Sequence, residues 1–366
     1  MVTRLLMTTD AVGGVWHYSL ELAASLRRSG VDTMLAVLGP APTAAQRDEA
    51  LATTGITLIE TGLPLDWLSD GPAPIRAAGQ AIADLARAEG VDLVQLNMPT
   101  LAAGVRFAVP VVAVTHGCVG TWWQAARSLP LAPQYHWHKR AMADGLAAAA
   151  RVVAPSAAYA ATVARHYALP AIPRVVHNGR TPGPRDALGP LADDVMTVGR
   201  LWDPVKNAAL LDRVAAGLAV PFRAAGAIRG PHGETATLEH LDLLGEIPSP
   251  DLARQLAARP VFVSAATFEP FGLAVLEAAA AGCALVLSDI ATFRELWDGV
   301  ATFVPANDEA GYTEAIETLI GDTALRTRLG EAARRRAARY TPERTADAML
   351  RVYASALPTG AVRAAA

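Results

Sequence analysis

The stretch "PVFVSAATFEPFGLAVLEAAAAGCALVLSD" (260–289) contains, in order, a β-branched apolar run, a loop, an alanine-rich segment and a second apolar run. The first run, 260–265, predicts a strand, and Gly282 predicts the end of the helix that follows. The second run, 283–288, predicts another strand. A strand, a helix and a strand of these lengths form the βαβ unit of a parallel sheet, so this stretch predicts an α/β fold.

The same alternation extends in both directions along the chain. Short apolar runs between alanine- and leucine-rich segments predict further strands at 4–10, 32–39, 56–61, 91–97, 109–115, 151–156 and 174–179, and then at 194–200, 221–226, 241–246 and 300–305. The stretch "TPGPRDALGP" (181–190) between the two sets concentrates Pro and Gly, which is typical of an interdomain hinge. The sequence therefore predicts two doubly wound Rossmann-like domains that face each other across a cleft.

Composition sets limits on function. The 366 residues are 52% hydrophobic and 18% charged, which favours a folded two-domain protein, and the net charge of -3 excludes broad affinity for nucleic acid. The two cysteines, Cys118 and Cys283, adjoin apolar runs and are predicted to be buried free thiols in a reducing compartment. No apolar run has the length of a signal peptide or a membrane span. We expect a cytoplasmic protein, and peripheral contact with the inner face of the plasma membrane stays open.

In parallel sheets, ligands bind where strands end and helices begin. Glu269 follows the strand at 260–265, Pro270 suits the first turn of the next helix, and Glu277 lies about two turns further on. Unpaired helix-start N–H groups are expected beside them, on Phe271, Gly272 and Leu273. Amides for an anion and carboxylates for hydroxyl groups suit a nucleotide sugar, which has a diphosphate between polyhydroxyl rings. Spacing alone also allows two glutamates that face solvent.

The segment "VGRLWDPVKN" (198–207) supplies positive charge at another strand end. Arg200 and Lys206 follow the strand at 194–200, where an arginine fork and a lysine point charge can neutralise a diphosphate. Plain surface charge is the alternative for these two residues taken alone. The chain contains no Asp-x-Asp stretch and no His/Cys cluster at ligand spacing, so we expect no metal site and no cofactor.

The segment "TFEPFGLAVLEAAAAGCALVLSD" resembles the nucleotide-sugar signature of the retaining glycosyltransferases of family 4, the glycogen-synthase-like and sucrose-synthase-like group, which have the GT-B fold. The resemblance implies that Glu269 contacts the hydroxyls of the donor sugar and that Glu277 binds the ribose. It also implies that the amides at 271–273 hold the sugar and the diphosphate. Arg200 and Lys206 resemble the Arg–Lys pair of this family, with one more residue between them than many members have.

The first half of the chain resembles the family less strongly. In "TTDAVGGVWHY" (8–18), Gly13 and Gly14 permit close approach of a phosphate or sugar, and they resemble the glycine loop of the family. In "VVAVTHGCVGTWW" (111–123), His116 stands at a strand end, where the family has a histidine that faces the donor sugar and counts as catalytic. Three indole rings are candidates for the acceptor side, with core or rim packing as the alternative: Trp16, Trp122 and Trp123.

These observations predict an acceptor-side domain at 1–180, a hinge at 181–190, a nucleotide-sugar-binding domain at 191–342 and a last helix at 343–366 that crosses back to the first domain. The resemblance implies transfer of a hexose from a UDP- or GDP-sugar, with retention and without a metal. The acceptor is a glycan, a lipid-linked sugar or a small alcohol. Three alternatives remain open, namely an epimerase of the same architecture, a non-catalytic nucleotide-sugar-binding protein and an NAD(P) oxidoreductase. The lack of a GxGxxG pattern at Gly13 weighs against the last.

Overall fold

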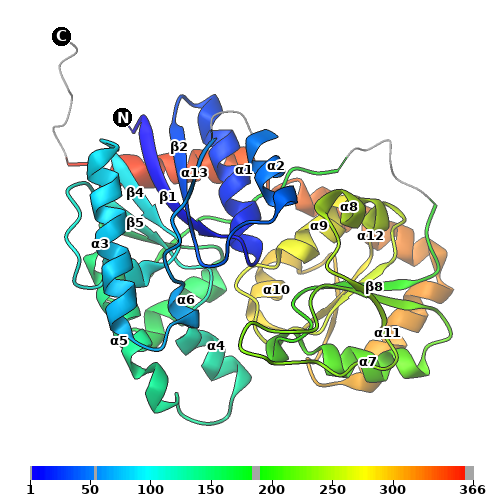
Figure 1. The fold of residues 1–366 in the computed structure, drawn as a ribbon. Helices are drawn as coiled ribbons and strands as arrows, with labels where there is room; N and C mark the ends of the chain where they lie inside the picture. The colour runs from blue at the N-terminus through cyan, green and yellow to red at the C-terminus, as the bar shows by residue number, and fades with distance from the viewer. Residues whose placement is uncertain (1, 53–55, 184–189, 359–366) are drawn as a thin grey trace. The chain divides into compact units, whose positions relative to one another are not determined.

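A computed structural model describes residues 2–52, 56–183 and 190–358. The chain divides into two compact units, which are coloured from blue to green with the red end, and from green to orange, in Figure 1. The N-terminal unit combines Met1–Gly179 with Pro342–Ala366, and the C-terminal unit is Arg180–Thr341.

The predicted hinge at 181–190 lies mostly outside the described residues, because residues 184–189 are not among them. The change from one unit to the other falls between Gly179 and Arg180 on the way out, and between Thr341 and Pro342 on the return.

The N-terminal unit contains a parallel seven-stranded sheet. Its strand order is β3-β2-β1-β4-β5-β6-β7. The strands are β1 (Arg4–Asp10), β2 (Asp32–Leu38), β3 (Ile56–Glu60), β4 (Leu93–Leu96), β5 (Val111–Val114), β6 (Arg151–Ala154) and β7 (Arg174–Val175). The connection from β1 runs toward β2 and the connection from β4 runs toward β5, in opposite directions. The topological switch point, where such sheets bind ligands, is therefore between β1 and β4.

The C-terminal unit contains a parallel six-stranded sheet in the order β10-β9-β8-β11-β12-β13. Its strands are β8 (Val195–Val198), β9 (Phe222–Ala225), β10 (Asp242–Gly245), β11 (Val261–Ser264), β12 (Leu285–Ser288) and β13 (Thr302–Val304). By the same reasoning, its switch point lies between β8 and β11. Each strand predicted from the sequence corresponds to a strand of one of the two sheets, so the predicted α/β class is confirmed.

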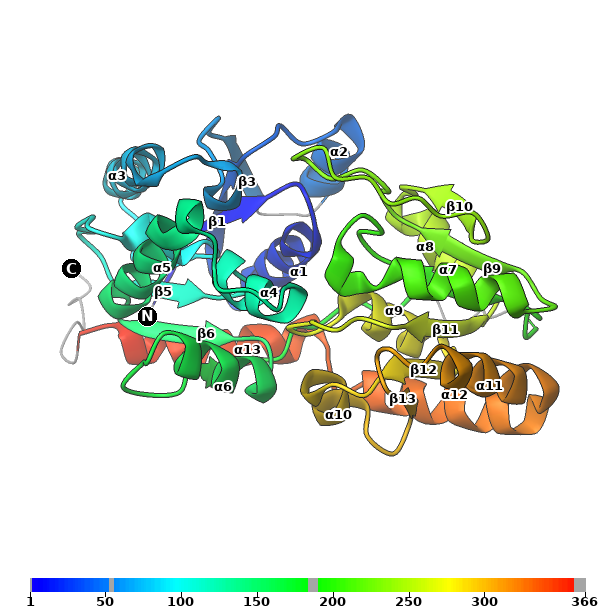
Figure 2. The ribbon, with the colours of Figure 1, turned by 90° about the horizontal axis from the view of Figure 1, so that it is seen from below.

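Helices cover both faces of each sheet, as Figures 1 and 2 show. In the N-terminal unit they are α1 (Gly14–Arg28), α2 (Ala44–Ala52), α3 (Pro72–Ala88), α4 (Val119–Ala126), α5 (His136–Ala148), α6 (Ala157–His166) and α13 (Pro342–Ala356). In the C-terminal unit they are α7 (Ala208–Gly217), α8 (Ser249–Ala257), α9 (Leu273–Ala281), α10 (Ala291–Trp297), α11 (Glu309–Gly321) and α12 (Thr323–Ala337).

The strand β11 shows why these runs are apolar throughout. Val261 and Val263 pack with α7 and α11 in one core, whereas Phe262 packs with α9, α10 and α12 in another. Successive side chains of a strand point to opposite faces, and both faces are covered here. An uninterrupted apolar run is therefore required in place of an alternating one.

The last helix, α13, belongs to the N-terminal unit and packs against α1 and β5. Met349, Val352 and Tyr353 of α13 lie in the same buried core as β1 and α1. The C-terminal end of the chain therefore completes the hydrophobic core of the first sheet.

Candidate functional site

Two loops meet at the switch point of the C-terminal unit. One follows β8 and contains the short 3-10 helix η5 (Pro204–Lys206), and the other follows β11 and leads to α9. The Thr267 N–H donates to the Val205 carbonyl at 2.8 Å, which joins the two loops. The predicted cations and the predicted sugar-binding glutamate are on these two loops, so the fold brings them to one place.

Lys206 and Glu269 contact each other directly. The Nζ of Lys206 donates to Oε2 of Glu269 at 2.5 Å, and the two side chains are 21% and 16% exposed. At this exposure the two charged groups keep part of their hydration, and water screens only part of the attraction between them. The cation that we predicted for the diphosphate and the carboxylate that we predicted for the sugar therefore neutralise each other here.

Arg200 is held by a residue that the sequence analysis did not single out. Its Nη2 donates to Oδ2 of Asp203 at 2.9 Å, and the guanidinium lies 5.7 Å from the ring centroid of Trp202. Asp203 is almost completely buried and also accepts the Val205 N–H at 3.2 Å, which caps η5. One buried carboxylate thus fixes both Arg200 and the short helix that carries Lys206. Its position three residues after Arg200 was the only sequence signal.

The helix α9 begins later than the sequence predicted. Its first residue is Leu273, so Pro270 precedes the helix and does not occupy its first turn. Gly272 is the N-cap, with φ of +92°, and a Cβ at this position would lie 3.1 Å from Phe293 and 3.3 Å from Glu269. Glycine is required there by the backbone conformation and by the close packing.

This late start corrects the predicted set of amides. The N–H groups of the first helical turn are those of Leu273, Ala274 and Val275, since the turn begins at 273. Phe271 is buried and its ring packs against Tyr340. Of the three predicted donors, only Leu273 lies within the first turn of the helix.

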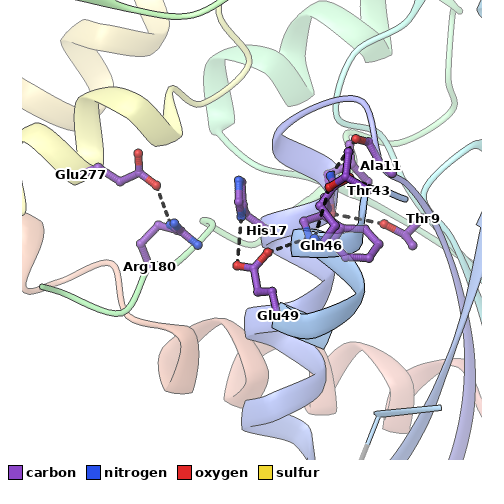
Figure 3. A network of polar contacts seen from close by, with 10 residues as sticks. Thr9, Ala11, His17, Thr43, Gln46, Glu49, Arg180 and Glu277 are labelled. Carbon is purple, nitrogen blue, oxygen red and sulfur yellow. Dashed lines mark hydrogen bonds and ion pairs between the residues drawn. The ribbon is translucent and has the colours of Figure 1, made fainter. Parts of the chain in front are cut away.

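Glu277, on α9, forms an ion pair that the sequence analysis missed. Nε of Arg180 donates to Oε1 of Glu277 at 2.7 Å, and the two side chains are 13% and 20% exposed. Figure 3 shows the two side chains pointing toward one another. The Arg180 N–H also donates to the Tyr340 carbonyl at 3.3 Å. A basic residue directly after "VVHNG" was the available signal, but the long separation from Glu277 concealed its partner.

In the N-terminal unit, Gly13 and Gly14 follow β1, and Gly13 is the N-cap of α1. The helix α2 packs close to this loop, because Nε2 of Gln46 donates to the Ala11 carbonyl at 2.9 Å (Figure 3). Glu49 of α2 accepts the indole N–H of Trp16 at 2.9 Å. Trp16 is fully buried in the core, so its prediction as an acceptor-side residue is wrong.

Figure 3 also shows His17, one residue after Trp16, pointing toward Glu49. The His17 Nδ1 lies 3.7 Å from Oε1 of Glu49, and the two side chains are partly exposed. The glycine loop therefore lies beside a carboxylate of α2 that contacts two consecutive residues of α1.

His116 follows β5. Its Nε2 is 3.1 Å from Oδ1 of Asn97, and its ring meets the ring of Tyr18 edge-on with centroids 4.5 Å apart. Burial lowers the pKa of His116 to about 4, because the charged form loses its hydration. The imidazole is therefore neutral at neutral pH.

Trp122 and Trp123 lie on α4 and are partly buried. The guanidinium of Arg127 stacks on both rings, 5.4 Å and 5.9 Å from their centroids. The Trp123 indole N–H donates to the Leu129 and Pro130 carbonyls at 3.0 and 3.1 Å. These two rings are part of a local cation–π cluster, and their assignment to the acceptor side stays a prediction.

Cys283 is buried, and burial raises the pKa of its thiol to about 12, while Cys118 is partly buried; both are free thiols. Within 2–52, 56–183 and 190–358, no three His, Cys, Asp or Glu side chains are grouped as a metal site would require. None of the described helices combines the length and the apolar character needed to cross a membrane.

Two family models match this chain. Residues 12–182 match the family described as Glycosyltransferase Family 4, and residues 192–322 match the family described as Glycosyl transferases group 1. The two matches follow each other along the chain and together cover most of it.

Curated relatives match over shorter segments. A phosphatidyl-myo-inositol mannosyltransferase of Mycobacterium leprae (strain TN) is 32% identical over 126 residues, which are 34% of each chain. An alpha-maltose-1-phosphate synthase of Mycobacterium tuberculosis (strain ATCC 25618 / H37Rv) is 35% identical over 112 residues, 27% of this chain and 29% of that protein. The match spans about a third of the length of these two relatives.

Solved structures share the whole fold at low identity. Sucrose-phosphate synthase from Thermosynechococcus elongatus has a TM-score of 0.76 at 17% identity and covers 96% of this chain and 98% of its own. Anabaena Alr3699/HepE in complex with UDP-glucose has a TM-score of 0.72 at 17% identity and covers 96% and 99%. At these identities the likeness shows the fold.

Proposed function

The chain belongs to the family 4, group 1 glycosyltransferases and has the GT-B fold, and we propose that it transfers a sugar from a nucleoside diphosphate sugar to an acceptor hydroxyl. The observation that carries the proposal is the Lys206–Glu269 contact of 2.5 Å at the switch point of the C-terminal unit. It puts a cation suited to a phosphate beside an acceptor suited to a sugar hydroxyl.

The diphosphate is assigned to Lys206, Arg200 and the first turn of α9. Breaking the bond between the sugar and the diphosphate concentrates negative charge on the leaving group. Fixed cations and helix-start N–H groups stabilise such charge without having to reorganise during the reaction. Because Lys206 is paired with Glu269, donor binding exchanges one anionic partner of Lys206 for another and releases the carboxylate for the sugar.

The two glutamates are assigned to the two rings of the donor. Glu269 orients the transferred sugar through its hydroxyls. Glu277 accepts hydrogen bonds from the ribose, and Arg180 holds the carboxylate in place through the contact at 2.7 Å. A residue held by packing and by an ion pair loses less entropy when the ligand binds, so Arg180 acts as a positioning residue.

The proposed reaction proceeds with retention and without a metal. The bond from the anomeric carbon to the diphosphate oxygen breaks, and the acceptor oxygen bonds to the same face of that carbon. The acceptor proton passes to the oxygen of the leaving phosphate. Neutral His116 contacts the donor sugar, and the two basic residues balance the charge that a metal would otherwise balance.

UDP is the first donor base to test, since the neighbour Alr3699/HepE is described in complex with UDP-glucose. GDP is the alternative. A glycan, a lipid-linked sugar or a small alcohol is the proposed acceptor class. The cytoplasmic location and peripheral membrane contact stay predictions.

The proposal is tested by a thermal-shift screen with UDP-, GDP- and ADP-sugars, followed by product analysis with and without an acceptor. We expect one nucleotide class to raise the melting temperature and to yield a new glycoside only when an acceptor is present. Conversion of the donor without acceptor would indicate an epimerase. Binding without any conversion would indicate a scaffold, and no binding would refute the proposed donor site.

A further inference from the structure

A chain of neutral hydrogen bonds surrounds His116 in the N-terminal unit. The Tyr353 hydroxyl donates to Oε1 of Gln95 at 2.5 Å, and Nε2 of Gln95 donates to Oδ1 of Asn97 at 3.0 Å. Oδ1 of Asn97 also lies 3.1 Å from Nε2 of His116. Gln95 is fully buried, and Tyr353 is nearly so. The ring of His116 is therefore connected to α13 through two amide side chains.

The amide of Asn97 has only one orientation that satisfies its neighbours. Its other end lies 2.8 Å from the carbonyl oxygen of Thr8, and a carbonyl can only accept a hydrogen bond. That end must therefore be the NH₂ group, which also lies 3.2 Å from the Ser19 hydroxyl. The reverse orientation would place two oxygens 2.8 Å apart and would turn the NH₂ group toward the NH₂ group of Gln95.

The orientation of Asn97 decides which ring nitrogen of His116 has the proton. Oδ1 of Asn97 can only accept, so Nε2 of His116 must donate. The ring is neutral at neutral pH because burial lowers its pKa to about 4, and a neutral imidazole has a single N–H. Nδ1 is therefore unprotonated and can only accept.

We propose that Asn97 is a positioning residue that fixes His116 in the Nε2–H tautomer, so that Nδ1 accepts a hydrogen bond from a hydroxyl of the donor sugar. The tautomer follows from the contacts of the free protein, whereas the role of Nδ1 rests on the proposed function. The opposite tautomer would present an N–H group, which cannot accept from a hydroxyl. Asn97 thus sets the direction of a polar contact that it does not make itself.

The tautomer is measured in the full-length protein without any ligand. The chain is labelled with ¹⁵N-histidine, and two-bond ¹H–¹⁵N correlations are recorded at neutral pH; a His116→Gln spectrum identifies the signals. We expect Nε2 at the shift of a protonated nitrogen, correlated with both ring C–H protons, and Nδ1 at the shift of an unprotonated nitrogen. A His116 ring with the proton on Nδ1, or equal populations of the tautomers, would refute the assignment.

Variants separate positioning from general packing. Asn97→Ala removes the acceptor and should mix the two tautomers. Ser19→Ala is the matched control, because it removes a partner of the Asn97 NH₂ group and leaves Oδ1 untouched. An unmixed Nε2–H signal in folded Asn97→Ala would overturn the role of Asn97. The wild-type spectrum alone tests the tautomer if this variant does not fold.

The functional part has its own measurement. With the donor found in the nucleotide-sugar screen, Asn97→Ala should lower kcat/KM about fivefold to tenfold, as expected for one neutral hydrogen bond. Equal rates in Asn97→Ala and wild type would refute the contact with Nδ1. Failure of the proposed function shows differently, as a wild-type protein that has the expected tautomer and binds no UDP- or GDP-sugar.

Discussion

The switch points of the two units contain different kinds of side chains. At the C-terminal one, the side chains are ionised and paired, Lys206 with Glu269 and Arg200 with Asp203. At the N-terminal one, the Asn97 amide accepts from the buried Gln95 amide, donates to the buried Ser19 hydroxyl and contacts the ring of His116, and these hydrogen bonds are neutral. Exchangeable ion pairs suit a ligand that brings its own charge, whereas a fixed neutral network suits a ligand that brings hydroxyls.

The energetic reason lies in burial. The Lys206–Glu269 pair is partly exposed and contributes little to stability, so its two members can change partner at low cost. Asn97 and His116 are themselves partly exposed, but Gln95 and Ser19, which the Asn97 amide contacts, are fully buried, and a buried polar group is costly to leave without its partner. Lys206 and Glu269 are therefore expected to respond to a ligand, and the N-terminal groups are expected to remain as they are.

The largest expected effect is on catalysis at the charged site. Glu269→Ala should lower the rate of sugar transfer about a thousandfold, because the donor sugar loses its orienting carboxylate at the reacting centre. The measurement is kcat with saturating donor and acceptor. Glu331→Gln, which breaks the exposed Glu331–Arg335 pair of α12, is the control and should leave the rate unchanged. A wild-type rate in Glu269→Ala would contradict the assignment.

The next effect tests the neutral site through pH. Burial lowers the pKa of His116 to about 4, whereas an unfolded histidine titrates near about 6.5. The unfolded state therefore binds the proton first, and the stability due to neutral His116 is present above about pH 6.5 and lost as the pH falls toward about 4. Urea unfolding should show wild type losing about 3 kcal/mol more than His116→Gln over this range. Parallel curves would contradict a ring that desolvation keeps neutral.

A smaller effect is expected on binding of free UDP. Lys206→Ala should raise the Kd about tenfold to a hundredfold, the range for a hydrogen bond to a charged group. Glu269→Gln should lower the Kd of UDP, because no carboxylate then competes with the diphosphate for Lys206. Calorimetric titration of both variants checks the exchange of partners. A Kd that rises in both variants would show that Glu269 does not compete with the diphosphate.

The smallest effect concerns Arg180. Arg180→Ala should weaken UDP binding about tenfold through a less ordered Glu277, which is the size of one charge-assisted hydrogen bond. The variant should leave the Kd of 2′,3′-dideoxy-UDP within about twofold, since that ligand has no ribose hydroxyls to lose. Arg180→Lys, which keeps the charge, should recover part of the affinity. Equal losses with both nucleotides would assign Arg180 to the fold and not to the ribose.

Local sequence patterns were sufficient to predict the strands of both sheets. They were not sufficient to predict which polar side chains contact one another. The strand runs could be predicted because a strand buried on both faces, such as Val261–Ser264, needs continuous apolar residues. The start of α9 was misplaced because Pro270 is a common helix-start signal, and no local pattern shows that Gly272 adopts the positive φ after which the helix begins. Trp16 was misassigned because an indole near a glycine loop has no local feature that reveals burial.

The polar pairs could not be predicted from local patterns because their members lie far apart in the sequence. Arg180 and Glu277 are 97 positions apart, and Gln95 and Tyr353 are 258 apart. Such contacts depend on how the units fold, and only the resulting geometry reveals them. The residues proposed for binding could be named from the sequence, whereas the side chains that contact them in the structure could not.

The backbone hydrogen bond from Arg180 to Tyr340 has a consequence for how this protein can change. It brings the two ends of the C-terminal unit, Arg180–Thr341, next to each other. A segment whose ends are adjacent behaves as a cassette inserted at one point of a host domain. Recombination can replace such a cassette as a single piece, while the host domain keeps its own last helix.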